Sequence, residues 1–376
     1  MDLKLVFNLV FGIFSFKQKN MRWFNLKRIV MVLLVLPVFV ILLIINRFFL
    51  FLDNLFFPFF RKQKINNPVF IISMPRTATT YLFHLLSKQK DRYTSIKLWE
   101  IIFAPSITQK IICLLVSKAD DLLGKPLKRL IIFFEEKVFK NLQSIHLIGL
   151  QYPEEDEALL LWDLSTAYFN FFYPDSNYFD AYLDFDNVLS ENQKSRIMRR
   201  YLNYIKRHNY VFNKSCERQF LSKNPLMMPK LEALYGVFPD AQIVSINRCP
   251  GDTMPSTIRL NNKLYSFFTS KKTPESLNEK TCIFLIKWYK NANKHLHTLY
   301  KDQSFIVDFN LLVSLNEEHI RQLLCFLKNE SYLNEVVKIS KKERKRHVAE
   351  KVYKSYSKKE IDKILVEIPF MKSYCN

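Results

Sequence analysis

The sequence predicts an α/β fold in which helices cover both faces of a mostly parallel central sheet. Short apolar runs that are typical of buried strands alternate with helical segments along the chain. The strand candidates are residues 69–72, 218–222, 242–247 and 304–308. Strands that alternate with helices form parallel sheets, because each crossover helix returns the chain to the same end of the sheet.

An apolar segment at residues 29–60 precedes the first strand. Residues 29–45 carry no charge, and the apolar run resumes at 48–60 after a two-residue polar break. We predict membrane contact, because so long an apolar stretch is rarely left on a soluble surface. Three arrangements remain open: a single transmembrane span, a hairpin kinked at Pro37, and a helix packed on the domain.

The composition restricts the function classes. The chain of 376 residues is 49% hydrophobic, which excludes general disorder, and we divide it into a membrane-associating segment (1–65) and a folded domain (66–376). The formal charge of +21 predicts a polyanionic partner or an anionic membrane face. We expect no nucleic-acid partner, because no helix-turn-helix, RNP or zinc-finger pattern occurs. The six cysteines form no CxxC pair, so we expect free thiols in a reducing compartment, although the spacing leaves one bridge open.

The turn after the first strand has the features of a phosphate cradle. Residues 74–79 end the strand, and residues 80–86 begin a helix. Unpaired backbone N–H groups and the helix dipole favour an anion at such a helix start. Arg76 adds a fixed positive group and three threonines add hydroxyl donors, although an ordinary strand–helix turn is the alternative. Neither GxxxxGK[ST] nor GxGxxG occurs in the chain, which argues against an ordinary NTPase, a P-loop kinase and a dinucleotide-binding domain.

A second constellation joins two strands through a helix. The strand at 218–222 is followed by Lys223-Asn224-Pro225, a helix and Phe238-Pro239-Asp240-Ala241. The strand at 242–247 is followed by Arg248-Cys249-Pro250 and then by Ser256, eight residues after the arginine. A guanidinium and a hydroxyl that converge from two elements suit a dianionic phosphate.

Together these motifs resemble the sulfotransferases that use 3′-phosphoadenosine 5′-phosphosulfate (PAPS). In that family the 5′-phosphosulfate loop reads Pro-[Lys/Arg]-[Ser/Thr]-Gly-Thr-Thr, and Lys-x-Pro, Phe-Pro-x-Ala, Arg-x-Pro and a serine follow in the same order. The resemblance covers residues 66–360 and implies a P-loop-like fold. It implies that PAPS is bound by Arg76, Thr77, Ala78, Thr79, Thr80, Arg248 and Ser256. Ala78 replaces the family's glycine, and alanine fits at this position only if the residue keeps a negative φ angle.

Two groups of acids are candidates for the base that takes the acceptor's proton. Glu100 follows a tryptophan, as in family members with an arginine in the loop, and we expect burial to raise its pKa towards neutrality. The run Glu154-Glu155-Asp156-Glu157 precedes an apolar helix, as in the same group of sulfotransferases. The catalytic candidates are therefore Arg76, Glu100, Glu155, Asp156 and Glu157. The alternatives are a surface glutamate at a helix end and acids that cap a helix start.

Two further stretches have two interpretations each. Residues 107–150 are amphipathic, and they either form a second membrane-facing layer or pack in the core. The basic stretch 341–347 either closes over PAPS through Arg344 and His347, as the resemblance implies, or is a solvated charge run.

The resemblance implies transfer of a sulfuryl group from PAPS to a hydroxyl or amine of a membrane-proximal acceptor, such as a lipid or glycan, without a metal. Arg76 would neutralise charge on the leaving oxygen. A nucleotide kinase of related fold and an inactive membrane scaffold with a residual nucleotide site are the alternatives.

We expect a cytoplasmic domain, because the resemblance implies a cytosolic donor. A Golgi-type lumenal domain is the alternative, which glycosylation triplets at Asn213 and Asn329 would suit.

Overall fold

The computed structural model describes residues 26–139, 149–172, 177–268, 273–339 and 356–375. Its centre is a sheet in the order β2-β3-β1-β4-β5, in which all neighbouring strands are parallel. The strands are β1 (Val69–Ile71), β2 (Tyr93–Thr94), β3 (Gln219–Lys223), β4 (Gln242–Asn247) and β5 (Ser304–Asp308). The predicted α/β fold with a parallel sheet is confirmed, and the edge strand β2 was not among the predicted strands.

The central strand β1 is buried on both faces. Val69 pairs with Leu221 of β3 on one side and with Gln242 of β4 on the other. The side chains of Val69 and Ile71 enter one hydrophobic core, and that of Phe70 enters the other. Successive side chains of a strand point to opposite faces, so a run without polar residues is what a strand covered on both faces requires.

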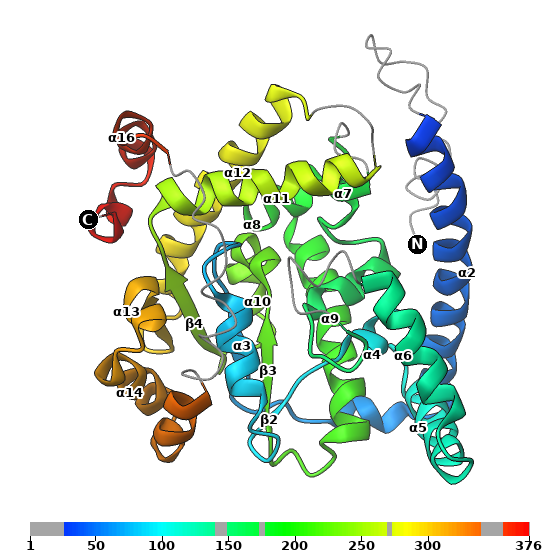
Figure 1. The fold of residues 1–376 in the computed structure, drawn as a ribbon. Helices are drawn as coiled ribbons and strands as arrows, with labels where there is room; N and C mark the ends of the chain where they lie inside the picture. Colours follow the sequence, from blue (N-terminus) through cyan, green and yellow to red (C-terminus); the bar gives the residue numbers. More distant parts are fainter. Residues whose placement is uncertain (1–25, 140–148, 173–176, 269–272, 340–355, 376) are drawn as a thin grey trace.

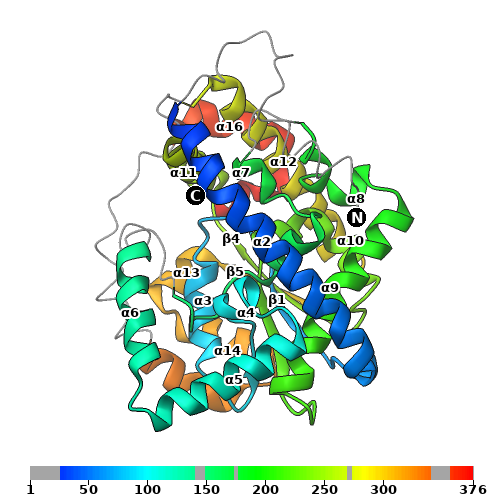
Figure 2. The ribbon, with the colours of Figure 1, turned by 90° about the vertical axis from the view of Figure 1, so that its right-hand side faces the viewer.

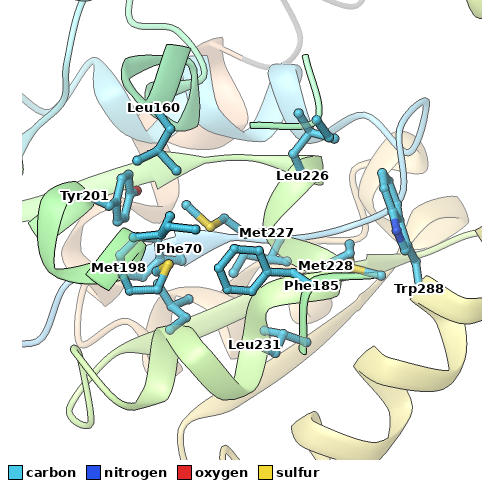
Figure 3. Close-up of a cluster of buried hydrophobic side chains, with 14 of the residues drawn as sticks. Phe70, Leu160, Phe185, Met198, Tyr201, Leu226, Met227, Met228, Leu231 and Trp288 are labelled. Atoms are coloured by element: carbon cyan, nitrogen blue, oxygen red, sulfur yellow. The ribbon is translucent and has the colours of Figure 1, made fainter. Parts of the chain in front are cut away.

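Helices cover both faces of the sheet (Figure 1). One face packs against α9 (Glu191–Phe212), α10 (Leu231–Tyr235) and α12 (Glu275–Leu296). The other face packs against α3 (Thr79–Ser87), α13 (Phe309–Ser314) and α14 (Glu317–Phe326). Figure 3 shows the centre of the first core, where Phe70 of β1 lies among Met198 and Tyr201 of α9 and Met227 from the segment after β3.

The remaining elements lie in the connections. They are α4 (Leu98–Ile102), α5 (Ile107–Leu122), α6 (Pro126–Phe139), η3 (Asp156–Asp163), α7 (Phe169–Phe172), η4 (Asp180–Tyr182), α8 (Phe185–Val188), η5 (Pro225–Lys230), α11 (Pro250–Phe268), η6 (Glu330–Tyr332), α16 (Lys358–Glu367) and η7 (Pro369–Tyr374). Of these, α11 follows β4 directly and packs against α16 near the end of the chain.

The N-terminal apolar segment forms one helix, α2 (Leu26–Phe56), which lies along the outside of the domain (Figures 1 and 2) and is followed by the short η2 (Pro58–Lys62). The helix continues through Pro37, so the kinked hairpin is wrong for these residues. Residues 33–56 have a mean hydropathy of 2.6, and by length and composition alone they could cross a membrane. Leu43 and Leu50 nevertheless belong to the first core, so α2 also packs on the domain.

Candidate active site

The loop between β1 and α3 has two residues with left-handed backbone conformation. Arg76 has a φ of 69°, and Ala78, which caps the N-terminus of α3, has a φ of 63° and a ψ of 20°. Ala78 therefore does not have the negative φ angle under which alanine fits without strain. The loop keeps the conformation that suits a glycine and accepts a cost of about 1–2 kcal/mol for the alanine Cβ.

Hydrogen bonds within the loop hold this conformation. The Thr77 hydroxyl donates to the Met74 carbonyl at 2.8 Å and is buried, while the Leu82 N–H donates to the Ala78 carbonyl at 3.1 Å. Thr79 and Thr80 open α3, whose first N–H groups have no partner within the helix. Buried Thr77 thus fixes the turn, and the helix start with Thr79 and Thr80 is the part suited to an anion.

The structure brings the two predicted motifs together, although they are more than 170 residues apart. Nη1 of Arg248 donates to the Arg76 carbonyl oxygen at 3.0 Å, and Nε of Arg76 donates to the Ser256 hydroxyl at 3.2 Å. Arg248 follows β4 and stacks over the ring of Phe309 at 4.3 Å, and Ser256 lies on α11. Two guanidinium groups and a hydroxyl therefore meet at the carboxyl edge of the sheet, where parallel sheets bind ligands.

The acid run 154–157 lies beside the same edge, but its members have different surroundings. The Glu155 carboxylate is partly exposed, forms an ion pair with Lys223 at 2.7 Å, and accepts a hydrogen bond from the Tyr168 hydroxyl. Lys223 ends β3 directly beside Ile71 of β1, so this pair is close to the origin of the loop. Glu154 is buried, and its N–H donates to the Ile96 carbonyl at 3.1 Å.

Asp156 and Glu157 are fully buried anchors. The Asp156 carboxylate accepts hydrogen bonds from Tyr201 (2.8 Å), Ser222 (3.0 Å) and Asn224. Burial raises the pKa of Asp156 to about 7, against the lowering effect of these three donors. Glu157 forms an ion pair with Lys230 and accepts from the Thr166 hydroxyl at 2.7 Å, and burial also raises its pKa.

Glu100 lies in a different environment, next to the edge strand β2. Burial alone would raise its pKa, but His208 (2.7 Å) and Lys110 (3.7 Å) together hold it below its ordinary value. The expected rise towards neutrality is therefore wrong, because partners were not visible in the sequence. Oε1 accepts the Lys97 N–H at 3.1 Å, and the second ring nitrogen of His208 bonds Thr94 at 2.7 Å, so both carboxylate oxygens have partners.

The end of the chain lies against the second motif. Arg344 and His347 fall outside the described residues, but the Tyr356 N–H donates to the Gly251 carbonyl at 3.0 Å. A disulfide joins Cys249, which follows Arg248, to Cys375. The expectation of free thiols is wrong for this pair and holds for Cys113, Cys216, Cys282 and Cys325. A sequence without CxxC spacing gave no signal for a bridge between residues 126 positions apart.

Sequence reasoning also missed Lys223 and Lys230 as charged partners of the acid run. Lys223 belongs to the Lys-x-Pro motif at the end of β3, and that position was the signal that could have identified it. Lys230 ends η5 and is fully buried, and a lone lysine in an apolar stretch gives no such signal.

In the described part of the chain, one group could hold a metal ion: the side chains of Asp186, Glu232 and His295, whose ligand atoms lie within 4.8 Å of one another. Asp186 accepts hydrogen bonds from the N–H groups of Glu232 (3.0 Å) and Ala233 (3.2 Å). The Asp186 carboxylate thus accepts hydrogen bonds from the backbone N–H groups in the first turn of α10. We therefore assign Asp186 a capping role.

A cavity of about 510 Å³ lies at the opposite, amino edge of the sheet. It is lined by residues at strand starts, among them Asn67, Gln219 and Gln242. None of the loop or acid residues described above lines this cavity. We therefore locate the candidate site where the two motifs meet, at the carboxyl edge of the sheet.

A parallel sheet with a hydroxyl-rich loop and two arginines at its carboxyl edge defines an α/β protein whose candidate site has the groups that suit a phosphorylated ligand. Residues 68–332 match the model of the Sulfotransferase family, and the chain belongs to this family.

Two similar proteins are the omega-hydroxy-beta-dihydromenaquinone-9 sulfotransferases Stf3 of Mycobacterium bovis and Mycobacterium tuberculosis. Each is 24% identical over an alignment of 273 positions, which covers 68% of this chain and 61% of the relative. The match thus spans about three fifths of the length of these relatives.

Two solved structures share the fold. Sulfotransferase STF9 from Mycobacterium avium has a TM-score of 0.65 at 15% identity, over 85% of this chain and 80% of that chain. Sulfotransferase STF1 from Mycobacterium tuberculosis has a TM-score of 0.63 at 15% identity, over 86% of this chain and 82% of that chain.

The raised pKa of Asp156 predicts a pH-dependent stability. Its ordinary pKa is 3.8 and its folded pKa is about 7, so between these values the folded state holds a proton that the unfolded chain has lost. The stabilisation of the folded state by the protonated Asp156 carboxyl is complete below about pH 4 and is lost as the pH rises through 7. Relative to Asp156→Asn, which cannot titrate, the wild type should lose roughly 4 kcal/mol of unfolding free energy between these limits.

Urea unfolding across this pH range measures the difference, with Asp362→Asn on the exposed face of α16 as the matched control. A difference between wild type and Asp156→Asn that is the same at every pH would contradict the assignment.

Proposed function

We propose that this protein is a sulfotransferase that moves a sulfuryl group from PAPS to a hydroxyl or amine of a membrane-proximal acceptor, such as a lipid or glycan. The observation that carries the proposal is the meeting of Arg76, Arg248 and Ser256 at one edge of the sheet. PAPS has phosphate groups at both its 5′ and 3′ positions, and two adjacent anion sites suit such a donor.

In this proposal the loop and the second motif hold the two ends of the donor. The start of α3, with Thr79, Thr80 and the backbone at Thr77 and Ala78, binds the 5′-phosphosulfate, while the Thr77 hydroxyl holds the turn. Arg248 and Ser256 bind the 3′-phosphate. Arg76 neutralises the charge that develops on the bridging oxygen when the bond from sulfur to that oxygen breaks.

Glu155 is the acid that we assign as the base. Asp156, Glu157 and Glu100 are buried, whereas the Glu155 side chain is 26% exposed and can be reached by an acceptor. Its partner Lys223 keeps it at the carboxyl edge of the sheet, close to the loop. The acceptor hydroxyl forms the new bond from oxygen to sulfur and gives its proton to Glu155, and adenosine 3′,5′-bisphosphate (PAP) leaves.

The acceptor class rests on two observations. The apolar helix α2 lies along the domain that carries the site, and a membrane anchor brings an enzyme to acceptors at the same membrane. The names of the two Stf3 relatives give a hydroxylated dihydromenaquinone as their acceptor, which is a lipid. A lipid or lipid-linked glycan is therefore the acceptor class that we propose here.

The two alternatives have less support. A nucleotide kinase would use a lysine-containing glycine loop, and the loop here has the sequence Pro75-Arg76-Thr77-Ala78-Thr79-Thr80. The inactive scaffold rested on the substitution at Ala78, but the loop takes the left-handed conformation of a glycine in spite of it.

Ligand binding tests the nucleotide assignment. PAP should raise the melting temperature of the full chain by roughly 5 °C at a hundred times its Kd, because binding to the folded state stabilises by mass action. ATP lacks a 3′-phosphate and should shift it much less. Differential scanning fluorimetry in detergent measures both shifts, and equal shifts for ATP and PAP would exclude the paired phosphate sites.

Kinetics with sulfur-labelled PAPS separate the roles of the site residues. Arg76→Ala and Glu155→Gln should lower kcat by about 10²–10³-fold with little change in donor affinity, because they act on the reacting groups. Arg248→Ala should raise the KM for PAPS by about 10–100-fold, because it contacts a phosphate that does not react.

Arg199→Ala, on the exposed surface of α9, is the matched control for loss of a guanidinium. An unchanged kcat in Arg76→Ala would contradict the proposal that Arg76 acts at the sulfuryl group.

We also propose that the domain faces the cytoplasm. The four free cysteines favour a reducing compartment. The glycosylation triplets do not support a lumenal domain, because the side chains of Asn213 and Asn329 are buried. Their amide nitrogens donate to the Arg218 carbonyl at 2.7 Å and to Gln89 at 2.6 Å. The disulfide from Cys249 to Cys375 is the observation that favours the lumenal alternative.

The exposed thiol of Cys325 on α14 decides between the two orientations. In sealed vesicles, a membrane-impermeant maleimide should label the full chain only from the cytoplasmic side, and Cys325→Ser should lose that label. Labelling only from the opposite side would overturn the cytoplasmic orientation.

A further inference from the structure

The helix α2 has one side against the domain and one side exposed along its length. Leu43, Asn46, Leu50 and Asp53 recur at helical spacing and are buried. The opposite side is apolar and exposed: Leu34, Val38, Ile41, Ile45, Phe48, Phe51 and Leu55. From Phe39 to the end of the helix, the structure therefore leaves one side of α2 available to a lipid.

Polar contacts fix α2 to the domain. Asp53 forms an ion pair with Arg207 of α9 at 2.9 Å, and its carboxylate accepts the N–H groups of Ile107 (2.8 Å) and Thr108 (3.0 Å) at the start of α5. Asn46 accepts from Gln109 at 2.7 Å. Removing one partner of such a buried pair is strongly unfavourable, so α2 and the domain move as one body.

These contacts conflict with a transmembrane span. Phe39 stacks on Trp162 at 5.7 Å, so the domain covers one side of α2 from Phe39 to Asp53, a length of about 21 Å. A span needs about 20 residues surrounded by hydrocarbon, and the contacts from Phe39 to Asp53 keep lipid away from one side of α2 over much of its described length. If α2 stood upright in a bilayer, the ion pair of Asp53 and the polar loops beside it would be drawn into the hydrocarbon.

A second apolar layer lies next to α2. Figure 2 looks onto this face, where α2 crosses the molecule, α5 passes beside its C-terminal half and α6 lies at one side. Asp120 accepts the N–H groups of Leu127 (2.7 Å) and Lys128 (3.0 Å), which fixes the turn between α5 and α6. Leu122 and Leu123 at this turn are 89% and 77% exposed. Further exposed apolar residues are Ile112, Leu115, Val116, Leu130, Ile131, Phe133 and Phe134.

Exposed basic residues accompany the apolar ones. They are Arg61, Lys62 and Lys64 after α2, and Lys118, Lys125, Lys128, Arg129 and Lys137 on α5, α6 and their turn. The exposed acids of this region, Asp121 and Glu136, are fewer. The ammonium of Lys137 lies 4.2 Å from the ring centre of Phe133, so basic and apolar groups lie side by side on α6.

We propose that α2, α5 and α6 form a monotopic docking surface that lies in the plane of one leaflet of an anionic bilayer, so that α2 does not span it. The apolar side enters the headgroup and acyl boundary, and the basic residues bind anionic headgroups. A second copy of this chain fits less well, because a symmetric dimer would bring two basic rims together. The proposal does not depend on the reaction, since it rests on packing and charge alone.

Topology distinguishes this arrangement from a span. The full chain carries one epitope tag before Met1 and another after Asn376, and sealed vesicles of both orientations are treated with protease. A helix in the plane leaves both tags on the same side of the membrane, so the two tags are cut together. A tag that is cut while the other is protected would overturn the proposal.

Vesicle flotation tests the contribution of α5 and α6. The double variant Leu122→Glu and Leu123→Glu should bind vesicles of phosphatidylcholine with 30% phosphatidylglycerol at least about tenfold more weakly than wild type, since two exposed leucines no longer enter the lipid. Val366→Glu is the matched control, because Val366 is equally exposed (80%) on α16, at the far side of the domain from α2 (Figure 1).

Equal melting temperatures of the three proteins establish that they fold alike, and binding is read without any turnover assay. Unchanged flotation of the double variant would overturn the proposal, because α2 alone would then anchor the chain. Equal binding to neutral and anionic vesicles would overturn the role of the basic residues, and a stable dimer that does not float would assign the surface to a second copy.

Discussion

The candidate site depends on one contact, in which the Arg248 guanidinium donates to the carbonyl oxygen of Arg76 at 3.0 Å. The strands β1 and β4 are parallel neighbours, so the segments that follow them leave the sheet at the same edge. The contact joins a loop and a strand end that are distant in the sequence into one surface. The ring of Phe309 beneath Arg248 restricts the guanidinium further, so less freedom is lost when an anion binds.

Buried charges then fix the acids relative to this contact. Lys223, Lys230 and Glu157 are buried and form ion pairs, and removing such charges from water can cost more than their attraction returns. The effect of these buried groups is to fix the position of Glu155. Asp156 ties η3 to Tyr201 of α9 and to the end of β3, and this leaves the neighbouring Glu155 at the edge of the sheet with its carboxylate partly exposed. Two buried anchors thus hold one accessible acid.

The sequence predicted what local patterns determine. The central strands and the helix start after the loop follow from short runs whose periodicity and residue types are visible in one dimension, and the pairing of the two motifs follows from the resemblance to the sulfotransferases. The pKa of Glu100 and the bridge from Cys249 to Cys375 could not be predicted, because each depends on tertiary neighbours. His208 and Lys110 reach Glu100 from two other helices, and burial without knowledge of those partners gives a pKa shift of the wrong sign.

The position of α2 connects the membrane-docking surface with the site. This helix packs against α11, which carries Ser256, and against η3, which begins at Asp156. Elements that hold the candidate donor and base therefore lie directly behind the helix whose outer side faces lipid in our proposal. An acceptor with a lipid tail could keep that tail in the leaflet while its polar end approaches the edge of the sheet, so it need not leave the membrane to react. If α2 stood upright in the bilayer, this arrangement would not form. The ion pair between Asp53 and Arg207 would then keep the polar domain next to α2 inside the hydrocarbon.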